Sequence, residues 1–159
     1  MALQKLNVLL LAFVLLVSCE GTVYHRFEQV DNSGWALHDT LQFVYEGSSL
    51  VTVGPGMEYA IQVRYDANYK YKDLCVRVET WNVCDTLLIS VDTLCCHIYD
   101  DSGRRLGFTA GTMYQNECMI QPLAASCTDT LLLRISHIMD DDSLQGVLDL
   151  GVRLAARRE

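Results

Sequence analysis

Hydrophobic and polar residues alternate with a period of two along most of the chain after residue 22. This spacing predicts β-strands that each have one buried face, and no stretch sustains the period of 3.6 that is typical of an amphipathic helix. The residues expected to share a strand face are Val23, His25 and Phe27; Leu41, Phe43 and Tyr45; Tyr59, Ile61, Val63 and Tyr65; Leu74, Val76 and Val78; Leu87, Ile89 and Val91; Leu94, Cys96 and Ile98; and Leu148, Leu150, Val152 and Leu154, with further strands over 112–120 and 130–136.

Tight turns separate these strands. Asp31–Gly34, Gly54–Gly56 and Asp100–Gly103 combine glycine with Asp, Asn, Ser or Pro, which favour turn conformations. Many short strands that each bury one face are most simply accommodated by two antiparallel sheets packed face to face. We therefore expect an all-β, antiparallel β-sandwich of jelly-roll-like form in a single domain, and a closed barrel is the alternative fold.

The first 22 residues have a different pattern. Lys5 precedes an apolar run from Leu6 to Val17, and the run ends in Leu16-Val17-Ser18-Cys19. This layout resembles the signal peptide and lipobox of bacterial lipoproteins, in which a small residue precedes the cut and the cysteine sulfur carries acyl chains. We expect a signal peptide over 1–18, cleavage between Ser18 and Cys19, a lipidated end and short tether over 19–22, and the β-sandwich over 23–159.

Two other interpretations of the N-terminal segment are open. A membrane-spanning helix needs about 20 apolar residues, and this run reaches Cys19 before that length. Cys19 could also be an ordinary thiol that follows a conventional signal peptide, although no small-x-small cleavage site competes nearby. With two or more acyl chains on Cys19, attachment to the membrane would be stable.

The net charge limits the classes of partner. The formal charge is −8, and loss of Lys5 with the signal peptide would make it −9. A protein this acidic, with no basic stripe, does not match a nucleic-acid-binding protein or one drawn to an anionic lipid surface by charge. We expect the lipid to provide the membrane attachment.

Six cysteines follow Cys19, at positions 75, 84, 95, 96, 118 and 127. An exported protein meets an oxidising environment, so an even number favours disulfides. If the strands around Cys75 and Cys95 form a hairpin centred near Asp85, these two cysteines lie opposite each other, whereas Cys96 points into the core. Cys118 and Cys127 could bridge a turn that contains Pro122. Buried free thiols are the equal alternative, and zinc is disfavoured because there is no CxxC pair.

No motif for catalysis or metal binding is evident. The four histidines, His25, His38, His97 and His137, are scattered and none accompanies a nucleophile motif. The run Asp140–Asp142 lacks the spaced ligands of a calcium loop and suits a solvated turn. We expect no cofactor and no metal. Tyr65, Tyr69, Tyr71 and Trp81 could form an exposed aromatic patch, although packing within the sandwich is the favoured interpretation.

Three segments together resemble the gliding-motility lipoprotein family GldH. They are 23–35, which ends in Ser33-Gly34-Trp35; 69–107, which contains Tyr69-Lys70-Tyr71-Lys72-Asp73-Leu74, Val91-Asp92-Thr93-Leu94 and Asp101-Ser102-Gly103-Arg104-Arg105-Leu106-Gly107; and 135–152, which runs from Ile135-Ser136-His137 to Gly151-Val152. Where family members tend to have Trp, this chain has Arg105, and it has more cysteines than the pattern.

The resemblance implies a cell-envelope lipoprotein that is needed for gliding and linked to protein secretion, without catalytic residues. We therefore expect a non-enzymatic protein, attached by lipid to the outer membrane, that contacts other envelope proteins of a motility or secretion complex. A glycan- or ligand-binding envelope lipoprotein is the alternative, and a hydrolase is a remote one. The first alternative requires the tyrosines to line a concave site.

Overall fold

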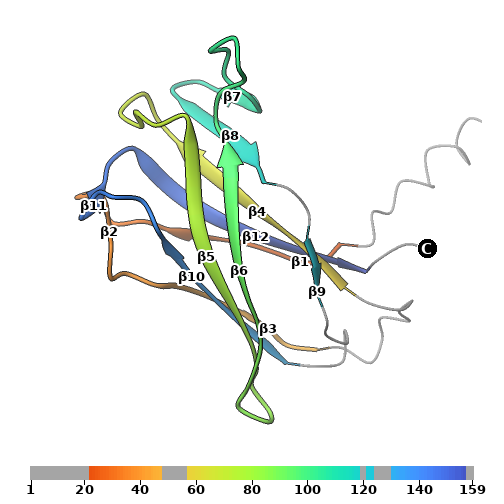
Figure 1. Cartoon of the computed structure of the whole chain (residues 1–159). Helices are drawn as coiled ribbons and strands as arrows, with labels where there is room; N and C mark the ends of the chain where they lie inside the picture. Colours follow the sequence, from red (N-terminus) through yellow and green to blue (C-terminus); the bar gives the residue numbers. More distant parts are fainter. Residues whose placement is uncertain (1–21, 48–56, 119–120, 124–129, 157–159) are drawn as a thin grey trace, which may run out of the picture.

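The protein forms two antiparallel β-sheets and a short two-stranded ribbon (Figure 1). The computed structural model describes residues 22–47, 57–118, 121–123 and 130–156. The strands are β1 (Thr22–Gln29), β2 (Trp35–Ala36), β3 (Leu41–Tyr45), β4 (Met57–Tyr65), β5 (Asp73–Asn82), β6 (Leu87–His97), β7 (Phe108–Ala110), β8 (Met113–Glu117), β9 (Gln121–Leu123), β10 (Leu131–His137), β11 (Ser143–Leu144) and β12 (Val147–Ala156).

The larger sheet has six strands. Its order is β1-β12-β4-β8-β7, and β9 pairs with a further part of β4. The register places Ile61 of β4 opposite Val152 of β12, and every second residue along both strands lies on the same side. The alternation in the sequence therefore becomes one continuous apolar face of this sheet.

The smaller sheet has four strands in the order β3-β10-β5-β6. Leu133 of β10 lies opposite Phe43 of β3 and Thr80 of β5, and Leu74 of β5 lies opposite Cys96 of β6. The residues on this side are buried along β10 and β5, and on the outer strands they include the buried Phe43 and Tyr45 of β3 and Leu94 and Cys96 of β6. A bulge between Thr80 and Trp81 shifts the register of β5 against β6 near their hairpin.

The inner faces of the two sheets form one hydrophobic core. Tyr59, Phe43, Leu74 and Leu154 are fully buried within it, although they come from both sheets. The Tyr59 hydroxyl donates a hydrogen bond of 3.0 Å to Asp92, which joins β4 to the inner face of β6. The predicted antiparallel β-sandwich is thus confirmed.

Strand β1 differs from its expected pattern. The register against β12 places His25 and Phe27 on the outer face of the six-stranded sheet. Their neighbour Tyr24 faces the other sheet, where its ring meets that of Tyr45 with centroids 6.0 Å apart. A register shift between Thr22 and Tyr24 lets Val23 also pack against the core, so the three residues do not share one face.

The first residues of β1 lie at the same end of the sandwich as the β5–β6 hairpin. Tyr24 contacts Tyr45, which is the last residue of β3 and lies opposite Leu131, the first residue of β10. Leu131 lies opposite Asn82, and Asn82 lies opposite Leu87 at the start of β6. We call this end the tether end.

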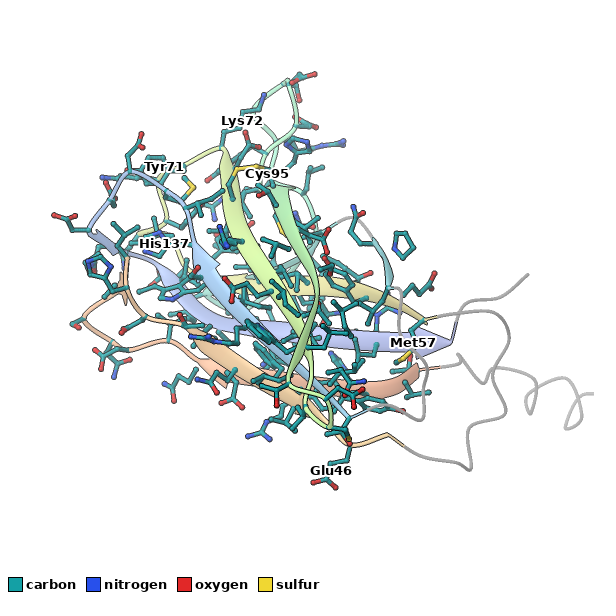
Figure 2. The ribbon with its side chains drawn as sticks, turned by 60° about the horizontal axis from the view of Figure 1, so that its bottom comes forward. Glu46, Met57, Tyr71, Lys72, Cys95 and His137 are labelled. Carbon is teal, nitrogen blue, oxygen red and sulfur yellow. A yellow bond between two sulfur atoms is a disulfide. The ribbon has the colours of Figure 1, made fainter. Side chains whose placement is uncertain are left out.

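Figure 2 shows the two ends of the sandwich. Glu46 and Met57 lie toward the tether end, and Tyr71, Lys72 and His137 lie toward the opposite end. The β5–β6 hairpin projects beyond the ends of β3 and β10 in Figure 1.

Candidate functional site

The predicted lipidation site lies outside the described residues. Ser18 and Cys19 precede Thr22, where β1 begins, so only Glu20 and Gly21 separate Cys19 from that strand. A segment of about three extended residues spans roughly 10 Å. A lipid on Cys19 would therefore hold the tether end close to the membrane.

Cys75 and Cys95 are joined by a disulfide across the β5–β6 hairpin. The two residues are register partners on the outer face of the four-stranded sheet, with Cα atoms 4.0 Å apart. The hairpin also positions Cys84 in its connecting loop, where the thiol is exposed and free.

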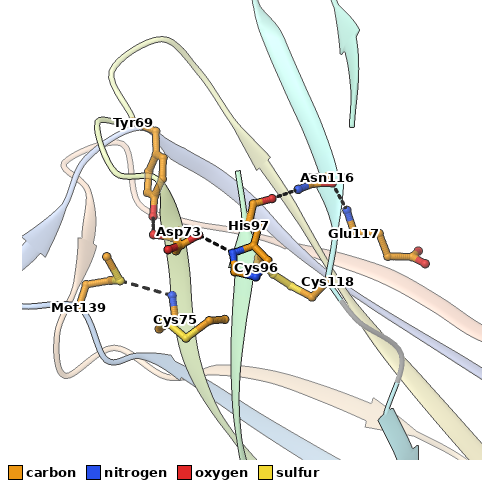
Figure 3. Close-up of a disulfide and its surroundings, with 10 residues drawn as sticks. Tyr69, Asp73, Cys75, Cys96, His97, Asn116, Glu117, Cys118 and Met139 are labelled. Carbon is orange, nitrogen blue, oxygen red and sulfur yellow. Dashed lines mark hydrogen bonds and ion pairs between the residues drawn. A yellow bond between two sulfur atoms is a disulfide. The ribbon is translucent and has the colours of Figure 1, made fainter. Parts of the chain in front are cut away.

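The structure corrects the expected partner of Cys118. Cys118 is bonded to Cys96, and the Cα atoms of the two residues are 4.7 Å apart (Figure 3). Cys96 faces the core as its position predicts, and Cys118 follows β8, where its backbone N donates to the Ile61 carbonyl at 2.7 Å. The two residues come from opposite sheets, so the bridge links the sheets covalently.

The bridge between Cys118 and Cys127 was therefore a wrong expectation. It assumed a turn around Pro122, whereas β9 runs through this proline and pairs antiparallel with β4. Pro122 can occupy such a strand because a short strand at the margin of a sheet need not donate from every backbone nitrogen. Cys127 lies outside the described residues.

The four histidines occupy separate places. His25 donates to Gln62 at 2.8 Å on the outer face of the six-stranded sheet, and His97 lies 2.6 Å from Asp73 at the end of the β5–β6 pair. His137 is buried at the end of β10 and is bonded to the Trp35 carbonyl at 3.0 Å, whereas His38 is exposed. In the part of the chain that the structure describes, no three acidic, histidine or cysteine side chains gather as metal ligands would.

The outer face of the six-stranded sheet carries a polar network. Gln62 and Arg153 both bond to Glu117, at 2.6 Å and 2.8 Å. Burial acts to raise the pKa of Glu117, but these hydrogen bonds outweigh it and hold the pKa below its usual range. Beside this network the Arg64 guanidinium lies 3.6 Å from the ring centre of Phe27. These groups satisfy one another and brace the sheet.

The predicted aromatic patch is divided between two ends of the molecule. Tyr65 and Tyr69 are buried and lie in contact, with ring centroids 5.8 Å apart, and Tyr71 is half-buried beside Tyr69. Trp81 instead lies near the tether end, on the outer face of β5. Packing thus accounts for Tyr65 and Tyr69.

Arg105 packs against a group of tyrosine rings that includes Tyr65 and Tyr114. Its guanidinium lies 4.0 Å from the ring centre of Tyr114, whose ring stacks on Tyr65. This contact suits a cation–π interaction. Arg105 therefore fills space against aromatic rings at the position where the resemblance leads us to expect tryptophan.

The acidic run 140–142 is held locally. The Asp141 carboxylate lies 3.5 Å from Lys70 Nζ, and the Asp142 carbonyl accepts a bond from the Leu37 nitrogen at 2.9 Å. A hydrogen bond from Tyr71 is the main reason that the pKa of Asp141 is lowered. The run lies in the β10–β11 loop and is held against the β4–β5 loop by Lys70 and against the β2–β3 loop by Leu37.

A row of apolar side chains crosses the outer face of the four-stranded sheet. Leu132 on β10 is the register partner of both Val44 on β3 and Trp81 on β5, and Trp81 pairs with Leu88 on β6. Val44 and Leu88 are 46% and 41% exposed. We call these four residues the terminal row, because they form the last outward-facing row of the sheet at the tether end.

The sequence contains a signal for this row that alternation alone does not interpret. Consecutive apolar residues occur at Leu131–Leu133 and at Leu87–Ile89. In a strand with one buried face, such a run must place apolar side chains outward as well as inward. The row also borders a hollow of about 330 Å³ beside Trp81, Val83 and Leu132.

Comparisons with known structures give weak similarities. A β-fructofuranosidase from Schwanniomyces occidentalis in complex with fructosyl-erythritol is 9% identical over 88% of this chain and 35% of its own, with a TM-score of 0.41. The Clostridium thermocellum xylanase 10B with its CBM22-1 and GH10 modules, in complex with xylohexaose, is 12% identical over 89% of this chain and 29% of its own, with a TM-score of 0.42. Eiger TNF from S. frugiperda is 11% identical over 85% of this chain and 94% of its own, with a TM-score of 0.30.

The chain therefore spans about a third of the length of the fructofuranosidase, and at these identities the similarities carry nothing about activity. A comparison with curated proteins found no match. No helix among the described residues has the length and hydrophobicity to cross a bilayer.

The family comparison is decisive. A model of the GldH lipoprotein family matches residues 22–154, which include β1 and all but the last residues of β12. This family is not an enzyme family. The chain therefore belongs to the GldH lipoprotein family, and this membership implies a gliding-motility lipoprotein that is held at the cell envelope by lipid.

Proposed function

We propose that this protein is a non-enzymatic accessory component of a gliding-motility machine linked to secretion, and that it acts at the outer membrane through protein contacts. Acyl chains on Cys19 fix its location, and the β-sandwich presents a binding surface to another envelope protein. Each buried methylene contributes about 0.8 kcal/mol, so two or more chains hold the protein stably. The family membership supports the general role.

The observation that carries the proposal is the free edge of β6. This strand has eleven residues and is the last strand of the four-stranded sheet. Within the described residues, no strand pairs with its second edge; near one end, Asn116 donates to the His97 carbonyl. An edge of this length offers backbone donors and acceptors to an extended segment of a partner.

The opposite edge of the same sheet is less suited to strand addition. β3 has five residues, and its end is flanked by β1 through the Tyr24–Tyr45 contact. An outward apolar side chain on β6 also favours protein contact, since Val91 is 44% exposed. We therefore place the partner on β6.

The alternative is a glycan- or ligand-binding lipoprotein. It requires aromatic rings that line a concave site, but Tyr65 and Tyr69 are buried in the core. A hollow of about 460 Å³ lies beside Trp35, Asp31 and Asp39, but Trp35 is only 1% exposed. No ring is available there for stacking on a sugar, so protein contact is the better-supported function.

Site-specific photocrosslinking in intact cells tests the proposal. A photoreactive residue at Thr93, which is exposed on β6, should repeatedly capture the same envelope protein. Val91→Lys should abolish this capture because lysine on an edge strand opposes strand addition. The matched control is Ile138→Lys at the opposite end, where the wild-type side chain is 45% exposed, compared with 44% for Val91.

Capture that survives Val91→Lys would contradict docking at this edge. Binding of sugars by the purified protein, without any recurrent protein partner, would favour the alternative function.

A further inference from the structure

The terminal row lies where a short tether brings the domain closest to its membrane. Thr22 follows Cys19 by three residues, and Tyr24 on the same strand contacts Tyr45. Val44, the neighbour of Tyr45, is the first member of the row. If Cys19 carries lipid, the chain before β1 is too short to hold this end far from the bilayer, because it spans roughly 10 Å.

The β5–β6 hairpin extends the apolar surface beyond the row. Val83 and Leu87, which flank its turn, are 46% and 59% exposed. The side-chain oxygen of Asn82 accepts a hydrogen bond of 2.9 Å from the backbone nitrogen of Cys84, and this bond stabilises the turn. Val83 and Leu87 are thus exposed at the hairpin beyond Trp81 and Leu88 of the row, and Leu87 lies on the opposite face of the ribbon from Leu88.

Charge changes sharply across this face. The next outward row, one step from the tether end, contains Arg134 opposite Glu79, with their charged groups 3.9 Å apart. Glu79 also accepts a bond from Trp81 Nε1 at 3.4 Å. The indole is thus apolar toward the tether end, and its polar nitrogen points to the charged row.

This arrangement is typical of a surface that sits at a lipid–water boundary. Tryptophan favours that boundary because its ring is apolar and its N–H is polar. Transfer of exposed leucine and valine side chains from water to acyl chains is favourable, because apolar surface is removed from water. Asp85 in the turn can remain among the headgroups, and no lysine or arginine belongs to the hairpin loop over residues 83–86.

We infer that the terminal row and the β5–β6 hairpin insert their apolar side chains into the interface of the membrane that holds the anchor, as a second membrane contact that orients the domain. The inference rests on the lipid anchor of the proposed function. We expect the bilayer to cover this surface, because the short tether keeps the surface close to the membrane. With two points of contact, the domain cannot rotate freely about its tether, and β6 keeps a fixed angle to the membrane.

Tryptophan fluorescence gives a direct test. The full acylated protein is placed in phosphatidylcholine vesicles whose lipids carry bromine at shallow acyl positions, which quench an indole at that depth. Trp81 should be quenched, whereas Trp35 is 1% exposed and lies on β2 beside the far end of β10. Trp81→Phe should therefore remove the quenching, and the remaining Trp35 signal should equal that in unbrominated vesicles.

Two further variants keep the test specific. Leu87→Ser combined with Leu88→Ser should lose most of the Trp81 quenching, while Ile138→Ser, at an exposed site of the opposite end, should retain it. Because apolar insertion and not headgroup charge drives the contact, the wild-type quenching should be the same at low and high salt. Near-ultraviolet circular dichroism shows whether each variant is folded.

The outcomes separate this inference from the anchor. Vesicle-bound, acylated protein with equal fluorescence in brominated and plain lipid would overturn the inference and leave the anchor intact. A protein without acyl chains would overturn the anchor and, with it, this second contact. Crosslinking of Trp81 to an envelope protein without any lipid quenching would assign the surface to a protein partner and overturn the membrane contact.

Discussion

The sulfur of Cys96, on the inner face of β6, is bonded to that of Cys118, which follows β8 in the other sheet. This is a covalent link between the two layers of the sandwich. It encloses a 22-residue separation, for which the loss of chain entropy in the unfolded state corresponds to roughly 3 kcal/mol. We predict that Cys96→Ala with Cys118→Ala lowers the free energy of unfolding by about that amount in urea.

The connectivity has its own test. In a protein with Cys84→Ser and Cys127→Ser, the cysteines at 75, 95, 96 and 118 should all be paired, as the structure has them. A thiol reagent added in denaturant without reductant should then label none of these four, and mass spectrometry of the unreduced digest should find Cys96 linked to Cys118 and Cys75 linked to Cys95. Labelling of Cys96 and Cys118 would contradict the bridge between the sheets.

The bond between Tyr59 and Asp92 predicts a buried polar contribution to stability. Asp92 faces the core and accepts bonds of 3.0 Å from both Tyr59 and Ser90. Burial and the nearby Asp92 charge raise the pKa of Tyr59, so the phenol remains a donor. Tyr59→Phe should lower the free energy of unfolding by roughly 1–2 kcal/mol, because the carboxylate loses its inter-sheet donor.

The control for this variant is Tyr71→Phe, where the half-buried ring lies outside the space between the sheets and its hydroxyl bonds to Asp141, whose carboxylate is near Lys70. Thermal unfolding should show little change for the control. Equal unfolding curves for Tyr59→Phe and the wild type would contradict the contribution assigned to the inter-sheet bond.

His137 predicts a loss of stability in mild acid. Its ring is 1% exposed and packs against Trp35 with centroids 5.3 Å apart. Burial lowers the pKa of His137 below the usual value of 6.5, although Asp141 acts in the opposite direction. The unfolded chain therefore binds more protons below pH 6.5 than the folded chain, and stability should fall as the pH decreases from about 6.5 toward the lowered folded-state pKa.

Urea unfolding between pH 7.5 and 5.5 measures this effect. The pKa values of Asp100, Asp141 and Glu117 are lowered from ordinary values that already lie below 5, so these groups change stability only below this window. His137→Gln should have a flatter dependence on pH than the wild type, whatever its absolute stability. An equal slope in both proteins would show that His137 is not the responsible group.

We predict that position 146 does not tolerate a side chain. It has a φ of +84°, and a Cβ there would overlap the backbone nitrogen of Tyr69. Gly103 has a similar φ of +79°, but a Cβ there meets nothing within 4 Å. Gly103→Ala should thus cost only the conformational strain of roughly 1–2 kcal/mol, and Gly146→Ala should cost clearly more. Thermal unfolding of both variants makes the comparison, and equal losses would rule out the close approach.

Local alternation predicted the strands that bury one face consistently. Tyr59–Tyr65 and Leu148–Leu154 follow the rule, and β4 and β12 pair through these segments. It failed at β1, because this edge strand has apolar residues on both sides and the shift near Tyr24 decides which of them meets the core. Strand parity correctly turned Cys96 inward and matches the observed pairing of Cys75 with Cys95.

The partner of Cys96 could not be obtained from parity, since the contact of β6 with the end of β8 depends on how two sheets stack. The terminal row had a signal in Leu131–Leu133, but its alignment with Trp81 required the register of four strands. Long-range register is thus the information that local patterns lacked.

Metabolic labelling with a palmitate analogue, followed by membrane fractionation, tests the central claim most directly. Wild-type protein and Cys84→Ala should carry the label and sediment with the outer membrane, whereas Cys19→Ala should lose the label and leave the membrane fraction after a carbonate wash. A wild-type protein without an acyl group on Cys19, or a Cys19→Ala protein that remains in the washed membrane without label, would contradict the account.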